Sequence, residues 1–131
     1  MNILFTGAGG AGSEAIWELL KNRYTLYFAD ANLDAINPKI PAESKLKIPW
    51  ANNINYIGEM IDICRNKDID VLVSTVDEEL LLLAENRKRF STTKVMLPSL
   101  EYIKKTLDKS QLMKLLSSKN IQIPYTIPLL D

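Results

Sequence analysis

The residues with the clearest chemical potential form a glycine-rich loop near the amino terminus. Four of the five glycines in this 131-residue chain, Gly7, Gly9, Gly10 and Gly12, follow the apolar run ILFT. Gly7, Gly9 and Gly12 fit the G-x-G-x-x-G pattern, and Asp30 stands about 20 residues further on, where a dinucleotide-binding acid meets a ribose hydroxyl. Such glycines permit a tight turn, and free amides at a helix start attract anions. Three interpretations remain open: a dinucleotide such as NAD or FAD, another anionic ligand, or a turn that only packs a helix on a strand.

A second polar group lies in the segment STVDEEL, which follows a valine-rich run. Thr75 and Glu78 have the spacing of a capping box, and Asp77 is also able to cap the next helix. Further on, Lys109 is expected in the first turn of a helix, where its charge opposes the helix dipole unless solvent or an anion compensates.

The composition excludes several classes of chemistry. The chain has no histidine, which rules out Ser-His-Asp and Cys-His nucleophiles and histidine-based zinc sites. Sixteen basic residues balance sixteen acidic ones, so no electrostatic footprint for nucleic acid or a membrane surface is present. Cys64, the single cysteine, falls in an apolar register and is expected to be a buried core thiol. We see no signal peptide or membrane span, and expect a cytoplasmic protein.

The spacing of apolar residues predicts alternating strands and helices. Strands are expected at 2–6, 24–29, 46–48, 70–74 and 94–97, and helices at 12–22, 54–67, 78–89, 99–106 and 108–118, with the run 87–89 as a solvated helix end. The first helix is expected to bury Ala15, Ile16, Leu19 and Leu20, and the second Ile54, Ile57, Ile61 and Cys64. Residues 31–45 are expected to form a loop and 121–127 an edge strand or tail.

This alternation predicts an α/β fold, in which a three-layer open, mostly parallel sheet carries helices on both faces. Ligands of such sheets gather where the strands end, which here means 7–12, 30–32, 49–52, 74–78 and 97–99.

The segments ILFTGAGG, ADANLDAINPKIPAESKLKIP, IDVLVSTVDEEL and LDKSQLMKLLSSKNIQIPYT occur in this order along the chain. Together they resemble the amino-terminal, pre-ATP-grasp region of ATP-grasp ligases, with the closest likeness to carbamoyl-phosphate-synthase-like proteins. The resemblance implies a Rossmann-like domain that forms part of the wall around the acceptor substrate and carries no dinucleotide. Gly7 to Gly12 then become a turn whose amides can meet a substrate carboxylate or phosphate, and Asp30 becomes a rim residue.

The resemblance also implies roles for the later polar residues. Thr75, Asp77 and Glu78 would belong to the substrate side, where Asp77 and Glu78 orient an amino group, since a carboxylate binds an ammonium more strongly than a neutral acceptor does. Lys109 would contact the nucleotide phosphates. ATP and Mg²⁺ would bind in the full-length ligase, in an ATP-grasp domain supplied in cis or in trans, so that no cofactor is firmly expected for this chain alone.

We therefore expect a pre-ATP-grasp domain at 1–107 and, at 108–131, a helix and strand leading into an ATP-grasp domain. The expected function is the substrate-side domain of an ATP-dependent carboxylate–amine ligase, inactive as this chain alone, with a small carboxylate or amine as substrate and no catalytic or metal-binding residue in this segment. Two other classes stay open. One is a free-standing NAD(P)-binding domain, and the other is a noncatalytic ligand-binding or protein-interaction module, with an apolar patch that allows a homodimer.

Overall fold

A computed structural model describes residues 1–127, and the chain divides into two compact units, Met1–Leu97 and the segment that begins at Pro98. The first unit contains β1 (Asn2–Thr6), α1 (Ser13–Leu20), β2 (Thr25–Asp30), β3 (Lys45–Lys47), α2 (Tyr56–Asn66), β4 (Val71–Ser74), α3 (Asp77–Glu85) and β5 (Lys94–Val95). Short 3-10 helices lie at Leu33–Ala35, Ala42–Ser44 and Arg87–Phe90. The second unit contains α4 (Leu100–Thr106) and α5 (Lys109–Ser118).

The five strands form one parallel sheet in the order β3-β2-β1-β4-β5. Phe5 on the central strand β1 is aligned with Phe28 on β2 and with Val73 on β4. The chain proceeds outward from β1 to β3 and then returns to the other side of β1 as β4. The direction of winding therefore reverses between β1 and β4, and this switch point is where open α/β sheets bind their ligands.

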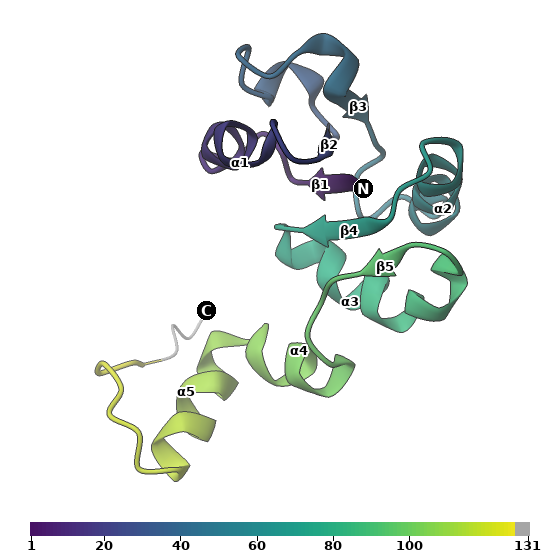
Figure 1. Cartoon of the computed structure of the whole chain (residues 1–131). Helices are drawn as coiled ribbons and strands as arrows, with labels where there is room; N and C mark the ends of the chain where they lie inside the picture. The colour runs from purple at the N-terminus through teal and green to yellow at the C-terminus, as the bar shows by residue number, and fades with distance from the viewer. Residues whose placement is uncertain (128–131) are drawn as a thin grey trace. The chain divides into compact units, whose positions relative to one another are not determined.

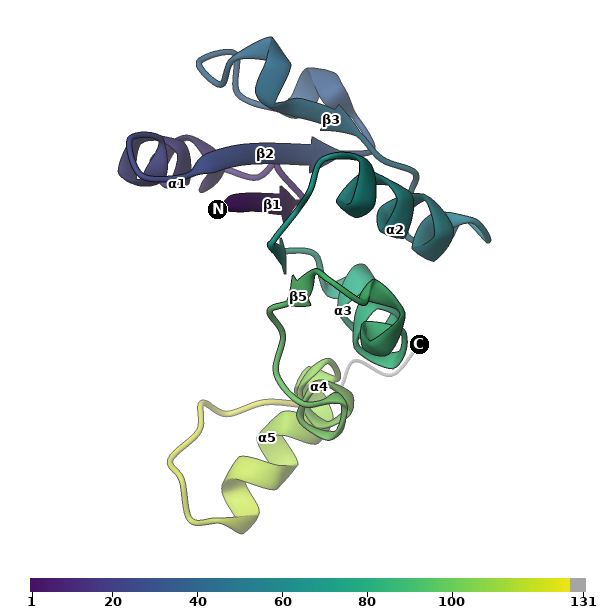
Figure 2. The same cartoon turned by 45° about the vertical axis from the view of Figure 1, so that its right-hand side comes forward.

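Each face of the sheet carries its own apolar core, which confirms the expected α/β fold with helices on both faces. On one face α2 and α3 cover Leu4, Ala29 and Leu72, with Met60 and Leu83 fully buried between the helices and the sheet (Figure 2). On the other face α1 and the segment after β2 cover a second set of buried side chains (Figure 1). That set includes Ile3, Phe5, Leu26, Phe28, Ile36, Ile40 and Val71.

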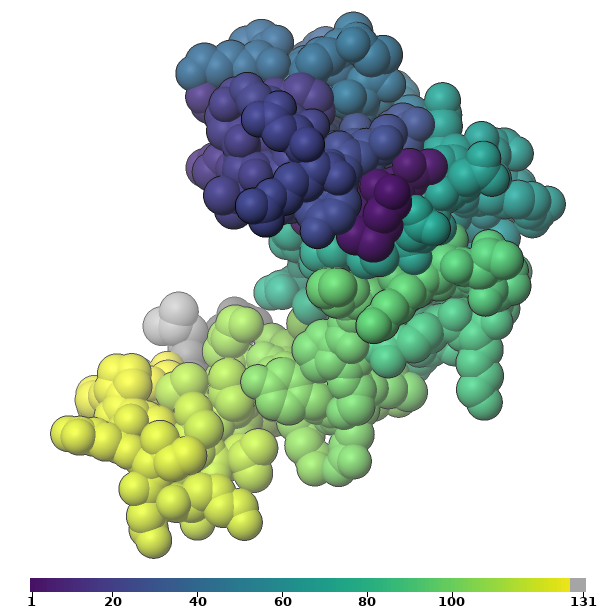
Figure 3. All heavy atoms as spheres, viewed as in Figure 1, coloured from purple at the N-terminus to yellow at the C-terminus, as the bar shows by residue number. Residues whose placement is uncertain are grey.

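Polar contacts join α1 to the segment after β2, and the two lie side by side in the space-filling view (Figure 3). Glu14 accepts hydrogen bonds from the Asn37 amide, at 2.7 Å, and from the Lys39 ammonium. The segment expected to be a loop is thus held in place by two 3-10 turns and by a link to the first helix.

The buried faces of the first two helices differ from the prediction. Trp17, together with Ile16 and Leu20, packs on the sheet and meets the Phe28 ring edge-on at 6.2 Å, whereas Leu19 is 77% exposed. Ala15 is also exposed. Ile54, expected in the second helix, precedes α2 and is 98% exposed. Trp17 and Leu19 both lie near the edge of the apolar stripe of α1, so the spacing of apolar residues does not show which of the two is buried.

Other elements are shorter than expected. The third helix ends at Glu85, and Arg87–Phe90 continues as a 3-10 turn in which Arg87 is half-buried and donates from Nη2 to the Leu97 carbonyl at 2.9 Å. The solvated-end interpretation therefore holds for Lys88 and Arg89, which are exposed, but is wrong for Arg87. Cys64 is buried as predicted, and burial raises the pKa of its thiol to about 11.

In the second unit the predicted caps are present. Ser99 accepts from the Tyr102 amide at the start of α4, and Asp108 accepts from the Ser110 and Gln111 amides at the start of α5. Asn120 has φ 57°, the left-handed conformation expected after this helix. Within the described residues, 121–127 belong to no strand, which leaves the tail interpretation for this segment.

Candidate functional site

The turns after β1 and β4 touch each other at the switch point. Gly7 has φ +69°, and a Cβ added there would lie 2.3 Å from Val76 Cγ2 and 2.8 Å from Thr75 Oγ1. Thr75 Oγ1 donates to the Thr6 carbonyl at 2.8 Å. Glycine is required at position 7 because no side chain fits between the two turns, and a left-handed backbone is costly for other residues. Residues of the two predicted site segments therefore lie side by side.

Three backbone amides of the glycine loop are bonded within the protein. Gly9 N donates to Asp30 Oδ2 at 2.8 Å, and Gly10 N donates to the Gly7 carbonyl at 3.1 Å. Ala8 N donates to the Ala29 carbonyl at 3.1 Å. The other oxygen of the Asp30 carboxylate accepts from Asn32 N at 2.9 Å. Asp30 thus ties the glycine loop to the end of β2, and the Gly9 amide is already bonded.

A cavity of about 680 Å³ opens where the strands end, on the face covered by α2 and α3. Its charged lining residues are Asp30, Glu78 and Glu79, and no basic side chain of the described residues joins them. Its apolar lining includes Trp50, which is 67% exposed, and further side chains of the surrounding elements. These are Ile48, Ile54, Ile57, Val76 and Leu82. The volume suits a small organic molecule, and the charges favour a cation over a phosphate or carboxylate.

Glu79 lies at the floor of this cavity and is 4% exposed. Its Oε2 accepts hydrogen bonds from the Ser74 hydroxyl, at 2.6 Å, and from the Thr6 hydroxyl. Because Thr6 ends β1 and Ser74 ends β4, the carboxylate bridges the two strands that flank the switch point. A buried charge is costly unless hydrogen bonds and opposite charges compensate it, and here two hydroxyl donors supply the hydrogen bonds.

Tyr56, the first residue of α2, faces the same carboxylate and is 1% exposed. Burial, followed by the negative charge of Glu79, raises the pKa of the Tyr56 hydroxyl well above its usual range, so the phenol stays protonated. The Glu79 carboxylate is also the side-chain hydrogen-bond partner of this buried hydroxyl.

The structure brings together some of the predicted site residues and separates others. Gly7, Asp30 and Glu78 line the cavity, whereas Gly9, Gly10 and Gly12, which are exposed, and Thr75 and Asp77 are not part of the lining. The capping interpretation of this segment is wrong, because Val76 occupies the N-cap position of α3 and makes no side-chain cap. Ser74 Oγ instead accepts from Val76 N at 3.3 Å.

Two important lining residues, Tyr56 and Glu79, were not predicted from the sequence, and Trp50 was included only within the strand end 49–52. Glu79 follows two other acidic residues, Asp77 and Glu78, and it is the one of the three whose side chain is buried. Tyr56 begins a helix whose start was expected at Ile54, so its side chain had no predicted direction. A signal was available for Trp50, since residues 49–52 follow the third strand at the ligand-bearing edge.

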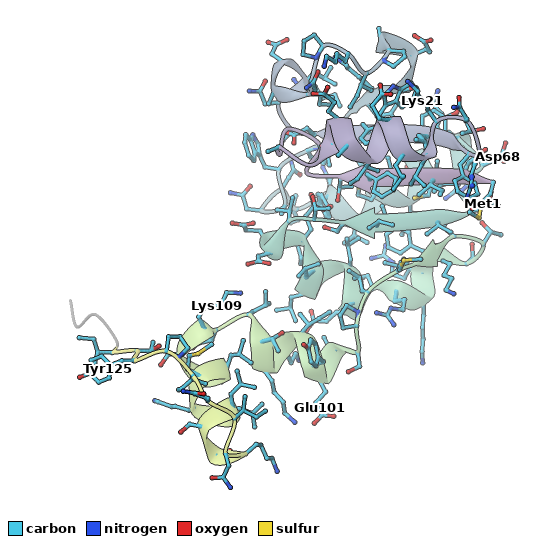
Figure 4. All side chains as sticks on the ribbon, turned by 60° about the vertical axis from the view of Figure 1, so that its left-hand side comes forward. Met1, Lys21, Asp68, Glu101, Lys109 and Tyr125 are labelled. Atoms are coloured by element: carbon cyan, nitrogen blue, oxygen red, sulfur yellow. The ribbon has the colours of Figure 1, made fainter. Side chains whose placement is uncertain are left out.

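Lys109 belongs to the second unit and is the first residue of α5, directly after the cap residue Asp108 (Figure 4). Its side chain is exposed. The capping bonds, led by the one from the Gln111 amide, lower the pKa of the Asp108 carboxyl. Phosphate contact by Lys109 stays a prediction.

Residues 1–127 contain no cluster of three or more His, Cys, Asp or Glu side chains arranged to hold a metal ion. Nor does this part of the chain contain a helix whose length and apolar character would let it cross a bilayer.

A family model described as the PylC-like, N-terminal domain matches residues 3–97. The chain belongs to this family. The family is the pre-ATP-grasp domain of ATP-grasp ligases, which confirms the resemblance inferred from the sequence. No curated protein matches the chain significantly.

Among solved structures, the chain is similar to dTDP-glucose 4,6-dehydratase from Bacillus anthracis, determined in complex with NAD. The TM-score is 0.52 and the identity 19%, over 72% of this chain and 36% of the dehydratase. The PylC-like domain thus shares the Rossmann-like sheet with this enzyme while spanning about a third of its length, and the likeness concerns the fold alone.

Proposed function

We propose that this PylC-like domain is the substrate-side domain of an ATP-dependent ligase that joins a carboxylate to an amine, and that its cavity holds the amine. In such a reaction ATP converts the carboxylate to an acyl phosphate and leaves as ADP. The amine nitrogen then attacks the acyl carbon, phosphate departs and a proton is released. ATP and Mg²⁺ would bind with the ATP-grasp domain, and Lys109 is our candidate for a phosphate contact.

The observation that carries this proposal is the charge of the cavity wall. Asp30, Glu78 and Glu79 are its charged groups, and they stand against an apolar surface formed by Trp50 and its neighbours. A protonated amine with an apolar body would gain from both, because charge-assisted hydrogen bonds to carboxylates are stronger than neutral ones. A carboxylate or pyrophosphate would be repelled from the same wall. The substrate-side role predicted for Glu78 is retained, and Glu79 is added to it.

The test is a kinetic assay on the complete polypeptide in which this domain occurs, with ADP release measured against a panel of amines and carboxylates. We expect Glu78→Gln to raise the KM for the amine about 10-fold, the loss typical of one hydrogen bond to a charged group, with little change in the KM for ATP. Glu79→Gln should act more strongly, and Glu78→Gln keeps the test informative if the buried substitution unfolds the domain.

The matched control is Glu59→Gln, which removes the same charge from an exposed position of α2 outside the cavity. Its KM for the amine should equal that of the unaltered protein. An amine KM that is unchanged in both Glu78→Gln and Glu79→Gln would overturn the assignment of the cavity. Residues 1–131 on their own should bind the amine yet release no ADP.

A further inference from the structure

Trp50 is a large apolar side chain of the cavity lining that neither core of the sheet uses. Of the two tryptophans in the chain, Trp17 packs on the sheet against Phe28, whereas Trp50 belongs to neither apolar core and is 67% exposed. Ile54, four residues further on, is 98% exposed and lines the same cavity. Two large apolar side chains left to solvent beside one cavity favour a role in binding, because packing of the core does not account for them.

The backbone that carries Trp50 is held on both sides. Before it, Ile48 is buried and its amide donates to the Asp30 carbonyl at 3.2 Å. After it, the Asn53 amide donates to the Trp50 carbonyl at 2.9 Å, and Asn53 Oδ1 accepts from the Asn55 amide at 2.8 Å. A hydrogen-bonded turn therefore presents the indole at the cavity, and a ligand that packs against it has little backbone to order.

The charge of the same lining lies on another element. Glu78 belongs to the first turn of α3 and is exposed, so its carboxylate is open to a ligand. A ligand that meets both Glu78 and Trp50 has a cationic group and a separate apolar body. Such a body loses contact with water where it packs against the indole, and each methylene transferred fully from water raises the affinity about 4-fold.

We infer that the substrate of this cavity is an amine carried on an uncharged apolar body, and that Trp50 is the specificity-determining residue that packs against this body. The inference rests on the proposed function, because it takes the ammonium group to lie at the acidic lining. It adds a selection rule. Affinity should rise with the length of the apolar body, and ammonia should bind weakly because it has no body to pack against the indole.

The probes are n-hexylamine and n-butylamine, which are both protonated at pH 7 and differ by two methylenes. Binding to the 131-residue chain is measured by NMR titration and mapped by the backbone amide signals of residues 50–57 and 76–79. We expect n-hexylamine to bind about 10-fold more tightly than n-butylamine. This ratio is smaller than full transfer of two methylenes would give, because an exposed wall leaves part of the chain in water.

The decisive variant is Trp50→Ala, which removes the indole from a largely exposed position and leaves both apolar cores intact. It should reduce the preference for n-hexylamine from about 10-fold to about 2-fold. Trp50→Phe keeps an aromatic face and should retain most of the preference. Leu19→Ala is the matched control, because Leu19 is 77% exposed on α1 and does not line the cavity. It should keep the full preference.

Glu78→Gln separates the inference from the proposed function. It should weaken both amines about 10-fold and leave their ratio unchanged, because both probes lose the same contact with a charged group. A preference that is lost in Trp50→Ala and kept in Leu19→Ala and Glu78→Gln supports the role of Trp50.

Two results would overturn the inference in different ways. If Trp50→Ala keeps the full preference while Glu78→Gln weakens both amines, the role of Trp50 is refuted and the proposed function stands. If neither amine binds the original chain at the mapped residues, the proposed function fails and the inference fails with it.

Discussion

The turn after β1 and the turn after β4 lie in contact, but their polar groups are used differently. In the first turn Gly9 N is bonded to Asp30 and Gly10 N to the Gly7 carbonyl, so that its polar groups stabilise the loop itself. Beyond the second turn, the Glu79 carboxylate accepts hydrogen bonds from two hydroxyls and stands beside the Tyr56 phenol, while Glu78 lies exposed in the cavity lining. The comparison teaches that a glycine pattern reports how closely backbones approach, whereas a ligand site requires polar groups that the fold leaves available.

The largest effect should follow from adding a side chain at Gly7. Gly7→Ala combines a left-handed backbone, which costs about 1–2 kcal/mol for residues other than glycine, with a Cβ 2.3 Å from Val76 Cγ2. Overpacking adds about 1–3 kcal/mol. We expect the free energy of unfolding, measured by urea denaturation, to fall by about 2–5 kcal/mol.

Gly58→Ala provides the contrast, because Gly58 lies inside α2 with no atom within 4 Å of the added Cβ. This substitution should raise the free energy of unfolding by about 0.5–1 kcal/mol through helix propensity. Equal stabilities for the two variants would show that the contact between the turns does not constrain position 7.

Asp30→Ala should have an intermediate effect. The substitution removes the acceptor of the Gly9 and Asn32 amides, at a cost of about 1–2 kcal/mol in unfolding free energy. Asp34→Ala, at an exposed position nearby, should stay within about 0.5 kcal/mol of the original chain.

The dinucleotide interpretation makes a different prediction for the same residue. If Asp30 met a ribose hydroxyl, the original chain would bind NADH at micromolar concentration, and Asp30→Ala would weaken that binding. We expect a fluorescence titration to show no saturable NADH binding, because the acidic wall repels a pyrophosphate and the Gly9 amide is already bonded. Micromolar binding abolished by Gly9→Val would restore the alternative.

The smallest effect concerns pH and the link between α1 and the segment after β2. The hydrogen bond from Lys39 lowers the pKa of the Glu14 carboxyl below its ordinary value of 4.5. A lowered pKa in the folded state means that the link stabilises the protein above the unfolded-state pKa and is lost as pH falls through the folded-state pKa. The stability difference between the original chain and Glu14→Gln should therefore be constant near neutral pH and vanish in acid.

A thermal-unfolding series from pH 7 down to pH 3 measures this difference. Lys39→Met provides the reference background. In this background the stability difference caused by Glu14→Gln should change much less with pH. A difference between the original chain and Glu14→Gln that grows toward acid pH would contradict the assigned sign.

The sequence predicted the sheet, the helices and the edge at which the candidate site lies, because valine-rich runs and apolar spacing report which residues face a core. It also predicted the caps at Ser99 and Asp108, which depend on local hydrogen bonds alone. Glu79 lies on the buried face of α3, four residues before Leu83, and the four consecutive leucines 80–83 conceal which face of the helix that is. The choice between Trp17 and Leu19 and the direction of Tyr56 depend on tertiary packing in the same way.

The close contact between the two turns at Gly7 has a consequence for redesign of the cavity. Because the two turns interlock there, that side of the cavity behaves as a fixed wall, and any attempt to widen it by mutation would first disturb the sheet. The opposite side is built from Trp50 and Ile54, which are largely exposed and precede α2, so their side chains can be exchanged at little expense to the core. To change the ligand that the cavity binds, one would therefore keep Gly7 and vary the segment that contains Trp50 and Ile54.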